Sequence, residues 1–376
     1  MFPSRVLRQR LRAHYWKDVP EGPLLTSLRK ATDASTVDLS VGAASLPSDT
    51  EVCVLPSNIL PESLGALVAL PALQAVVLPY AGLLPKHLHP LQSAFGPRLG
   101  SSVQLHNLHH NAAMTAEMAI ALMLAAAKRL VPADRRLRSG DWRPRGIPYP
   151  LSGADDDDTG GREPALPMLG LDGQTALVLG LGGIGTRVAA VCAALGMRVL
   201  GTKRQALSSS HSGGGQGGNS SVGIEVHPPS ELRALLPSAN VLLVCLPHTA
   251  ETAGLLGAAE LALLPQDAVL VNVSRGAIVD EHALYEALAS GRLHGAGLDV
   301  WWRYPASYAE ASDTPPSRLH DYGALDTVVL SPHRGGGVGV PGLELTRMRH
   351  VGDMLTEAGR RGVARMPHRW DFNSGY

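Results

Sequence analysis

The sequence has few cysteines, no excess of either charge and no long hydrophobic run. Its three cysteines are far apart and form no CxxC pair, so we expect neither a disulfide scaffold nor a metal site. This cysteine usage is typical of a protein in a reducing compartment, and we expect the cytoplasm. Because 33 basic residues balance 33 acidic ones, there is no chain-wide basic surface for nucleic acid. The longest apolar run, residues 118–127, is too short to cross a bilayer.

Glycine, proline and apolar residues are abundant. The 41 glycines and 28 prolines among 376 residues indicate many turns, and the 45% hydrophobic content is enough for a sizeable core. At roughly 150 residues per domain, two domains are expected. Predicted strands and helices alternate, which indicates an α/β fold with parallel sheets. Strands are predicted at 36–42, 51–57 and 73–82, helices at 23–31 and 61–70, and the strongest helix at 115–138.

Three segments have unusual composition. Residues 1–17 carry four arginines and one lysine and contain no acid; they are interpreted as a basic first helix, and an organelle transit peptide is the alternative. Residues 143–168 form a Pro/Gly-rich linker whose acidic run, 155–158, is expected to be solvated rather than to bind metal. The Ser/Gly tract 208–221 is expected to be a flexible surface insertion.

The first motif with a functional meaning is a glycine-rich turn at residues 180–185. TALVLGLGGIG has the GxGxxG spacing, follows a continuous apolar strand and precedes a predicted helix. In that setting the first glycine makes a tight turn, the second lets the backbone approach a pyrophosphate, and the third packs the helix on the strand. The motif predicts a dinucleotide site built by Gly180, Gly182, Gly183, Ile184 and Gly185.

The end of the next strand indicates which dinucleotide binds. NAD sites usually place an acid there, about 20 residues after the turn, for the ribose 2′-hydroxyl. This chain has Lys203 and Arg204 instead, and no Asp or Glu lies between 186 and 224. Two cations attract a 2′-phosphate, which favours NADP(H) over NAD(H). The alternative is that both are ordinary surface charges and NAD still binds.

Further motifs follow in a fixed order: VCLPHTAETAGLL at 244–256, LVNVSRGAIVDEHALYEALASGRLHGAGLDV at 270–300 and SPHRGG at 331–336. With GLGGIG and the helix at 115–138, they make the chain resemble the D-isomer-specific 2-hydroxyacid dehydrogenases, which include glyoxylate/hydroxypyruvate reductases and phosphoglycerate dehydrogenases. The resemblance implies two Rossmann-like domains, with a doubly wound NAD(P)-binding domain (112–340) inserted into a flavodoxin-like substrate domain (1–111, completed by 341–376). It also implies a homodimer that transfers hydride between NAD(P)H and a small 2-oxo or 2-hydroxy acid.

The same resemblance assigns site residues. Arg275 is implied to grip the substrate carboxylate, because a guanidinium stays charged and binds carboxylate in a bidentate fork. His333 is implied to be the general acid/base. The turn at Tyr80, Ala81 and Gly82 is implied to add backbone amides for the carboxylate. The cofactor is implied to be lined by Cys245 (for which a core role is an equal alternative), Leu246, Pro247, Thr252, Val273 and Asp299.

One position departs from the family pattern. Where relatives read DVFxxEP, with a glutamate that hydrogen-bonds the catalytic histidine, this chain has Tyr304 before Pro305. A tyrosine hydroxyl can accept a hydrogen bond and orient the ring, but it carries no charge near neutral pH. A dinucleotide-binding regulatory or corepressor-like protein with little turnover is therefore the alternative function. The neighbouring Trp301 and Trp302 either shape the pocket or belong to the core.

Overall fold

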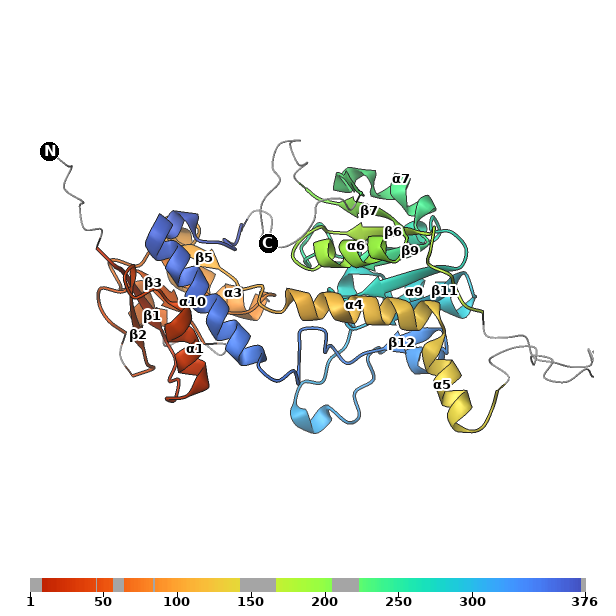
Figure 1. Cartoon of the computed structure of the whole chain (residues 1–376), viewed down its shortest axis with the longest axis horizontal. Coiled ribbons are helices and arrows are strands. Elements are labelled where there is room, and N and C mark those ends of the chain that lie inside the picture. Colours follow the sequence, from red (N-terminus) through yellow and green to blue (C-terminus); the bar gives the residue numbers. More distant parts are fainter. Residues whose placement is uncertain are drawn as a thin grey trace, which may run out of the picture. The chain divides into compact units, whose positions relative to one another are not determined.

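Two parallel β-sheets form the framework of the protein, one in each of two units (Figure 1). A computed structural model describes residues 9–44, 46–56, 64–83, 85–142, 167–204 and 223–372. The first unit comprises Met1–Asn111 and Gly339–Tyr376, and the second comprises Ala112–Val338. The second unit thus interrupts the first along the chain. The predicted insertions 143–168 and 208–221 lie outside the described residues, apart from 167–168.

The sheet of the first unit has five strands in the order β2-β1-β3-β4-β5. Successive side chains of a strand point to opposite faces, so Val52 and Val54 lie in the core on one face and Cys53 in the core on the other. Helices α1 and α10 cover the first face, and α2 and α3 the second. The strands are β1 (Leu11–Tyr15), β2 (Val37–Val41), β3 (Val52–Val54), β4 (Ala75–Val77) and β5 (Gln104–His106); the helices are α1 (Pro23–Ala31), α2 (Leu64–Val68), α3 (Pro85–Phe95) and α10 (Leu343–Arg361).

The prediction of a basic first helix is wrong for the described part of residues 1–17. Residues Leu11–Tyr15 form β1, which pairs with both β2 and β3. Arg12 is the arginine of this strand. Its guanidinium forms an ion pair with the Asp49 carboxylate. Residues 1–8, on which the transit-peptide interpretation also rests, lie outside the described residues.

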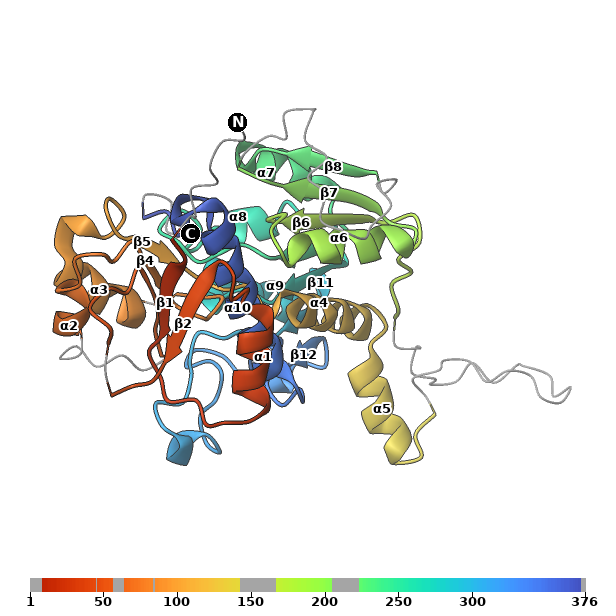
Figure 2. The ribbon, with the colours of Figure 1, turned by 60° about the vertical axis from the view of Figure 1, so that its left-hand side comes forward.

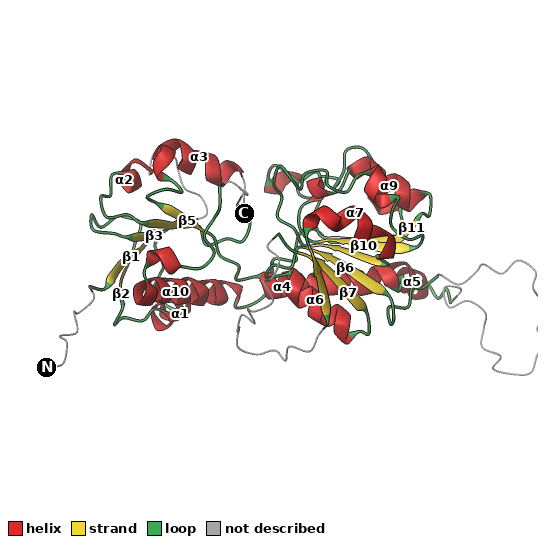
Figure 3. Ribbon diagram, turned by 90° about the horizontal axis from the view of Figure 1, so that it is seen from above, coloured by secondary structure: helices red, strands yellow, loops and turns green. Residues whose placement is uncertain are grey.

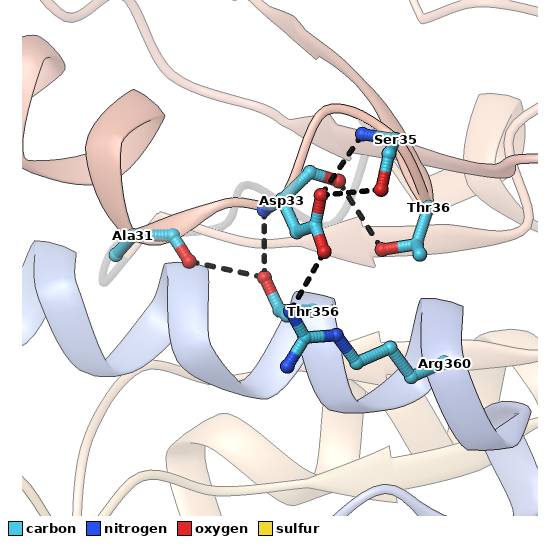
Figure 4. Close-up of polar contacts among 6 residues, drawn as sticks. All are labelled: Ala31, Asp33, Ser35, Thr36, Thr356 and Arg360. Atoms are coloured by element: carbon cyan, nitrogen blue, oxygen red, sulfur yellow. Dashed lines mark hydrogen bonds and ion pairs between the residues drawn. The ribbon is translucent and has the colours of Figure 1, made fainter.

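The last helix returns to the first unit and is held there by polar contacts (Figures 2 and 4). The Asp33 carboxylate accepts hydrogen bonds from the backbone and hydroxyl of Ser35 and from Arg360 of α10. These donors lower the pKa of Asp33 to about 2. The Thr356 hydroxyl accepts from the Asp33 N–H and donates to the Ala31 carbonyl. Residues more than 300 positions apart therefore close the helical layer over β1 and β2.

The sheet of the second unit has seven parallel strands in the order β12-β11-β10-β9-β6-β7-β8. Helices lie on both of its faces (Figure 3): α4 and α6 on one, and α7, α8 and α9 on the other. The strands are β6 (Thr175–Leu179), β7 (Arg198–Thr202), β8 (Ile224–His227), β9 (Val241–Val244), β10 (Ala268–Asn272), β11 (Leu293–Leu298) and β12 (Val328–Leu330); the helices are α4 (Ala112–Ala127), α5 (Leu130–Arg138), α6 (Gly185–Ala194), α7 (Leu232–Leu235), α8 (Ala258–Leu261) and α9 (Glu281–Ala289).

The order in which the chain adds strands to this sheet reverses between β6 and β9. From β6 the chain winds outward through β7 and β8, then returns to place β9 on the other side of β6. In doubly wound sheets a ligand binds beyond the carboxyl ends of the strands at this reversal. The α/β, doubly wound fold class predicted from the sequence is confirmed.

The single helix predicted over 115–138 is wrong in detail, because two helices occupy that stretch. Arg129 has a left-handed backbone, with φ 51°, between α4 and α5. Pro132 supplies the physical reason, because it has no N–H to donate to the carbonyl four residues earlier. The helix that packs on the sheet therefore ends at Ala127, and α5 runs in a different direction from α4 (Figure 1).

Candidate active site

The glycine-rich turn follows β6, the strand at the reversal point. Gly180 has φ +92°, and a Cβ there would lie 3.0 Å from the Cys245 carbonyl oxygen. A Cβ on Gly185 would lie 2.0 Å from the Gly180 carbonyl oxygen, so only glycine lets α6 start this close to the strand. The Gly180 N–H donates to the Thr202 hydroxyl of β7 at 3.1 Å, which fixes the turn. Such a cradle at a helix amino terminus suits a pyrophosphate.

The loop after β9 faces this turn. Leu246 is the side chain that a Cβ on Gly180 would strike, at 3.0 Å. The Thr252 hydroxyl donates to the Pro247 carbonyl at 2.7 Å and accepts from the Thr249 N–H at 2.8 Å, so Thr252 braces the loop from within. Burial raises the pKa of the Cys245 thiol to about 12. The thiol is therefore neutral at physiological pH, and its side chain packs against the apolar core of this unit.

A carboxylate that was not expected from the sequence lies near the end of β7. Lys203 and Arg204 follow β7 as predicted, but the expectation of an acid-free surrounding is wrong. The Glu251 carboxylate lies 3.6 Å from the Arg204 guanidinium. Glu251 belongs to the loop after β9, 47 positions along the chain, and only the fold brings it here. One of the two cations thus already has an anionic partner.

Arg275 lies in the turn after β10. The Asn272 side-chain amide donates to the Arg275 carbonyl at 3.0 Å, and the Ser274 hydroxyl donates to the Val244 carbonyl of β9 at 2.9 Å. A Cβ on Gly276 would lie 2.4 Å from the Trp301 carbonyl oxygen, so the glycine lets this turn pack against the segment that carries Tyr304. The turn of Arg275 is therefore fixed on both sides. Val273, one of the predicted lining residues, is buried.

His333 sits in a loop that Asp299 organises. The Asp299 carboxylate, only 1% exposed, accepts hydrogen bonds from the Ser331 hydroxyl and from the N–H groups of Arg334 and Gly335. His333 itself has a left-handed backbone, with φ 57°. This conformation is uncommon for a residue with a side chain. Asp299, which was predicted to line the cofactor, therefore holds the loop of His333 in this uncommon conformation.

Tyr304 meets His333 through its ring rather than its hydroxyl. The two ring centroids are 5.5 Å apart and the planes are tilted by 51°. The Tyr304 hydroxyl accepts a hydrogen bond from the Trp301 N–H at 3.1 Å. The expectation that this hydroxyl orients the histidine is therefore wrong for the described contacts. An uncharged ring occupies the place beside the imidazole.

Arg275, Tyr304 and His333 form one electrostatic group. Burial is the main cause that lowers the pKa of His333; the Arg275 charge lowers it further, and Asp299 opposes both. Burial likewise lowers the pKa of Arg275 and raises that of Tyr304. At neutral pH the group holds one cation, a neutral phenol and a histidine that loses its proton more readily than in water. Such a set can bind a carboxylate and exchange a proton beside it.

The two tryptophans belong to the core. The Trp301 indole N–H donates to the Ser331 carbonyl at 2.8 Å, and that of Trp302 donates to the Val279 carbonyl at 2.9 Å. Both rings pack near the fully buried Tyr322. Trp301 therefore ties the Tyr304 segment to the His333 loop.

The predicted carboxylate-binding turn lies in the first unit. The Asn107 side-chain amide donates to the Ala81 carbonyl at 2.8 Å, and the Leu108 N–H donates to the Tyr80 carbonyl at 3.1 Å. The Arg347 guanidinium of α10 lies 4.9 Å from the centre of the Tyr80 ring. These contacts fix Tyr80 and Ala81 in the turn, whose third residue is Gly82. Sequence reasoning did not identify Arg347, since nothing in the sequence pairs α10 with this turn.

Two classes of feature are missing from the described ranges. They contain no group of three or more His, Cys, Asp or Glu side chains placed to hold a metal ion. In the same residues, no helix has the length and apolar character needed to span a membrane.

The fold and this site define a Rossmann-type dinucleotide-binding domain with an Arg/His pair. The sequence profile of the D-isomer specific 2-hydroxyacid dehydrogenase NAD-binding domain matches residues 120–335, more than half of the chain. The chain therefore belongs to the D-isomer specific 2-hydroxyacid dehydrogenase family. This confirms the family resemblance.

Individual proteins with similar sequences are named as reductases and dehydrogenases. The chain is 34% identical over 223 residues to a glyoxylate reductase of Thermococcus onnurineus, covering 59% of this chain and 56% of that protein. It is 34% identical over 230 residues to a D-3-phosphoglycerate dehydrogenase of Archaeoglobus fulgidus, covering 59% and 35%. The chain thus spans about half the length, or less, of these curated relatives.

A solved structure covers more of the chain. The D-isomer specific 2-hydroxyacid dehydrogenase of Xanthobacter autotrophicus, crystallised with NADPH and MES, aligns with a TM-score of 0.66 over 98% of this chain and 100% of that one, at 23% identity. At this identity the likeness shows a shared fold.

Proposed function

We propose that the protein is an NAD(P)-dependent oxidoreductase that interconverts small 2-oxo and D-2-hydroxy acids. The observation that carries the proposal is the group of Arg275, His333 and Asp299 in the unit that bears the glycine-rich turn. In this proposal residues 112–340 bind the cofactor, and residues 1–111 with 341–376 bind the substrate. The Arg275 guanidinium of the second unit then binds the substrate carboxylate.

Each residue has a defined task in this mechanism. A bound nicotinamide cofactor supplies or accepts the hydride. The Arg275 guanidinium binds the carboxylate and polarises the neighbouring carbonyl. During reduction His333 donates a proton to the C2 oxygen, and during oxidation it takes that proton back. Asp299 holds the His333 loop through Ser331 and two backbone amides, so the imidazole presents a fixed face.

The residues described fit such a cofactor, and we propose that NADP(H) binds better than NAD(H). Gly185 lets helix α6 begin close against β6, and the N–H groups at this helix amino terminus suit a pyrophosphate. Lys203 and Arg204 follow β7, where the 2′-position of the ribose is recognised. The solved relative from Xanthobacter autotrophicus, which holds NADPH, lends support by analogy.

We further propose a cytoplasmic homodimer. Helix α5 and the turn after it expose apolar side chains, namely Leu130, Val131, Leu137 and Trp142. Exposed apolar groups on one short segment are typical of an interface. The three cysteines are free thiols, which suits a reducing compartment. Sedimentation velocity of the wild type and of Leu137→Glu measures the oligomeric state.

A regulatory or corepressor-like protein is the second candidate, and one observation favours it. The neutral Tyr304 ring occupies the place beside His333 where relatives have a carboxylate. This removes a charge that would retain the catalytic proton. We favour the enzyme, because a buried Asp299 still fixes the loop that carries His333, and the Arg275 charge still lies close enough to lower the pKa of that histidine.

A panel of substrates tests the choice. NADPH and NADH consumption is followed by absorbance with glyoxylate, hydroxypyruvate, pyruvate and larger 2-oxo acids between pH 5 and pH 8. We expect turnover of at least one acid, fastest at the acidic end. Tight cofactor binding without turnover of any acid would support the regulatory alternative instead.

A further inference from the structure

An ion pair joins the two loops on either side of the glycine-rich turn. Strand β6, which carries the turn, lies between β7 and β9 in the sheet. Arg204 lies two positions beyond the end of β7, and Glu251 lies in the loop that follows β9. Their charged groups are nevertheless 3.6 Å apart. Because neighbouring strands are about 4.8 Å apart, the loops start about 10 Å from each other, and the two side chains close that gap.

The position of this pair matters for a dinucleotide. The residue after the second strand of such a domain recognises the ribose 2′-position, and the turn after the first strand holds the pyrophosphate. The adenosine end of a cofactor therefore lies between the end of β7 and the loop after β9. The Arg204–Glu251 pair stands at that place.

The chemistry of the pair makes it replaceable. Its side chains are 42% and 73% exposed, and such an exposed ion pair changes an equilibrium constant by only about fivefold or less. A 2′-phosphate has more charge than one carboxylate and fits the guanidinium fork as well. A 2′-hydroxyl offers Arg204 no charge, so NAD(H) leaves the pair intact. Glu251 and the 2′-phosphate thus need the same partner.

We infer that Glu251 is a cofactor-specificity residue that competes with the 2′-phosphate of NADP(H) for Arg204. The inference rests on the proposed function, which places a dinucleotide in this site. In free protein Glu251 holds Arg204, and NADP(H) binds by displacing it. Lys203 is not part of this ion pair, so its attraction for the 2′-phosphate does not depend on Glu251. The preference for NADP(H) is consequently smaller than the two cations alone would give.

A double-mutant cycle tests this competition. Dissociation constants of NADPH and NADH are measured by nucleotide fluorescence for the wild type, Glu251→Gln, Arg204→Ala and the double variant. Glu286→Gln, which removes an exposed acid from α9 in the same unit, controls for the change in net charge. We expect Glu251→Gln to tighten NADPH about three- to fivefold and to leave NADH within twofold. In the Arg204→Ala background the same substitution should have no effect on NADPH.

Three results would overturn the inference: NADPH affinity unaffected by Glu251→Gln, equal tightening of both cofactors, or tightening that persists without Arg204. Persistence would mean plain repulsion between Glu251 and the phosphate rather than competition. A wild type that prefers NADH, yet still shows the coupling, would refute the proposed NADP(H) preference and uphold the competition. A wild type that binds neither dinucleotide would refute both.

Discussion

Replacing Tyr304 with glutamate should move the pH profile of carbonyl reduction to higher pH. The Tyr304 ring centre lies 5.5 Å from that of His333, and no formal charge stands at that place. Burial and the Arg275 charge already lower the pKa of His333. Reduction needs the protonated imidazole, so its rate falls as pH rises through this pKa. A carboxylate beside the ring stabilises the imidazolium and raises the pKa.

Coulomb's law gives the size of the shift. One unit charge at 5.5 Å from another contributes about 3 kcal/mol at an effective dielectric constant near 20, or about two pKa units. Since Tyr304 is 45% exposed, solvent screening reduces this to about one unit. The fall of the reduction rate should therefore move up by about one pH unit in Tyr304→Glu.

Single-turnover rates from pH 5 to pH 9, with saturating NADPH and substrate, measure the shift directly. Tyr304→Gln is the matched control, because glutamine has the size of glutamate without its charge. Both variants lose the hydroxyl that accepts from the Trp301 N–H, so this structural cost cancels in the comparison. Coincident pH profiles for active Glu and Gln variants would refute the electrostatic role of position 304.

Three further variants or conditions test other parts of the structure. Asp299→Asn should lower the free energy of unfolding by about 3 kcal/mol, because an amide cannot accept all three hydrogen bonds, and should reduce kcat more than NADPH affinity; unchanged thermal stability would contradict this. Arg275→Lys should lower kcat/KM by about a hundredfold or more, since an ammonium does not reproduce the fork; a rate within threefold of wild type would remove Arg275 from the site. Acid should destabilise the first unit, because burial lowers the pKa of the fully buried His106 to about 4. A group with a depressed histidine pKa stabilises the fold above about pH 6.5 and loses that contribution as pH falls toward 4, up to about 3 kcal/mol here; urea unfolding at pH 7 and pH 5 with equal midpoints would contradict it.

Much of the second unit could be predicted from the sequence. Strands such as Val241–Val244 and Ala268–Asn272 are buried on both faces, so they read as continuous apolar runs. The glycine-rich turn was identified because its strand and helix flank it at the required spacing. Strand β8 (Ile224–His227) was missed because it lies at the sheet edge, half exposed and with charged residues.

Other features depend on contacts between distant residues. Strand β1 resembled a basic helix because no acid lies near its arginine in the sequence. The partner of that arginine, Asp49, is 37 positions away. The Arg204–Glu251 pair and the hold of Asp299 on the His333 loop likewise join separate strands. The break at Arg129 is different, because Pro132 was a readable signal within the predicted helix. Local pattern thus located the chemical groups, and the sheet order determined their partners.

The central claim is that His333 transfers a proton during reduction of a 2-oxo acid. Its most direct test compares single-turnover NADPH oxidation by the wild type and His333→Gln, with the best acid of the panel, together with NADPH affinity. The claim predicts a rate lower by about 10²- to 10⁴-fold in the variant, with a dissociation constant within a few-fold of wild type. Equal rates in the two proteins, with equal cofactor affinity, would contradict it.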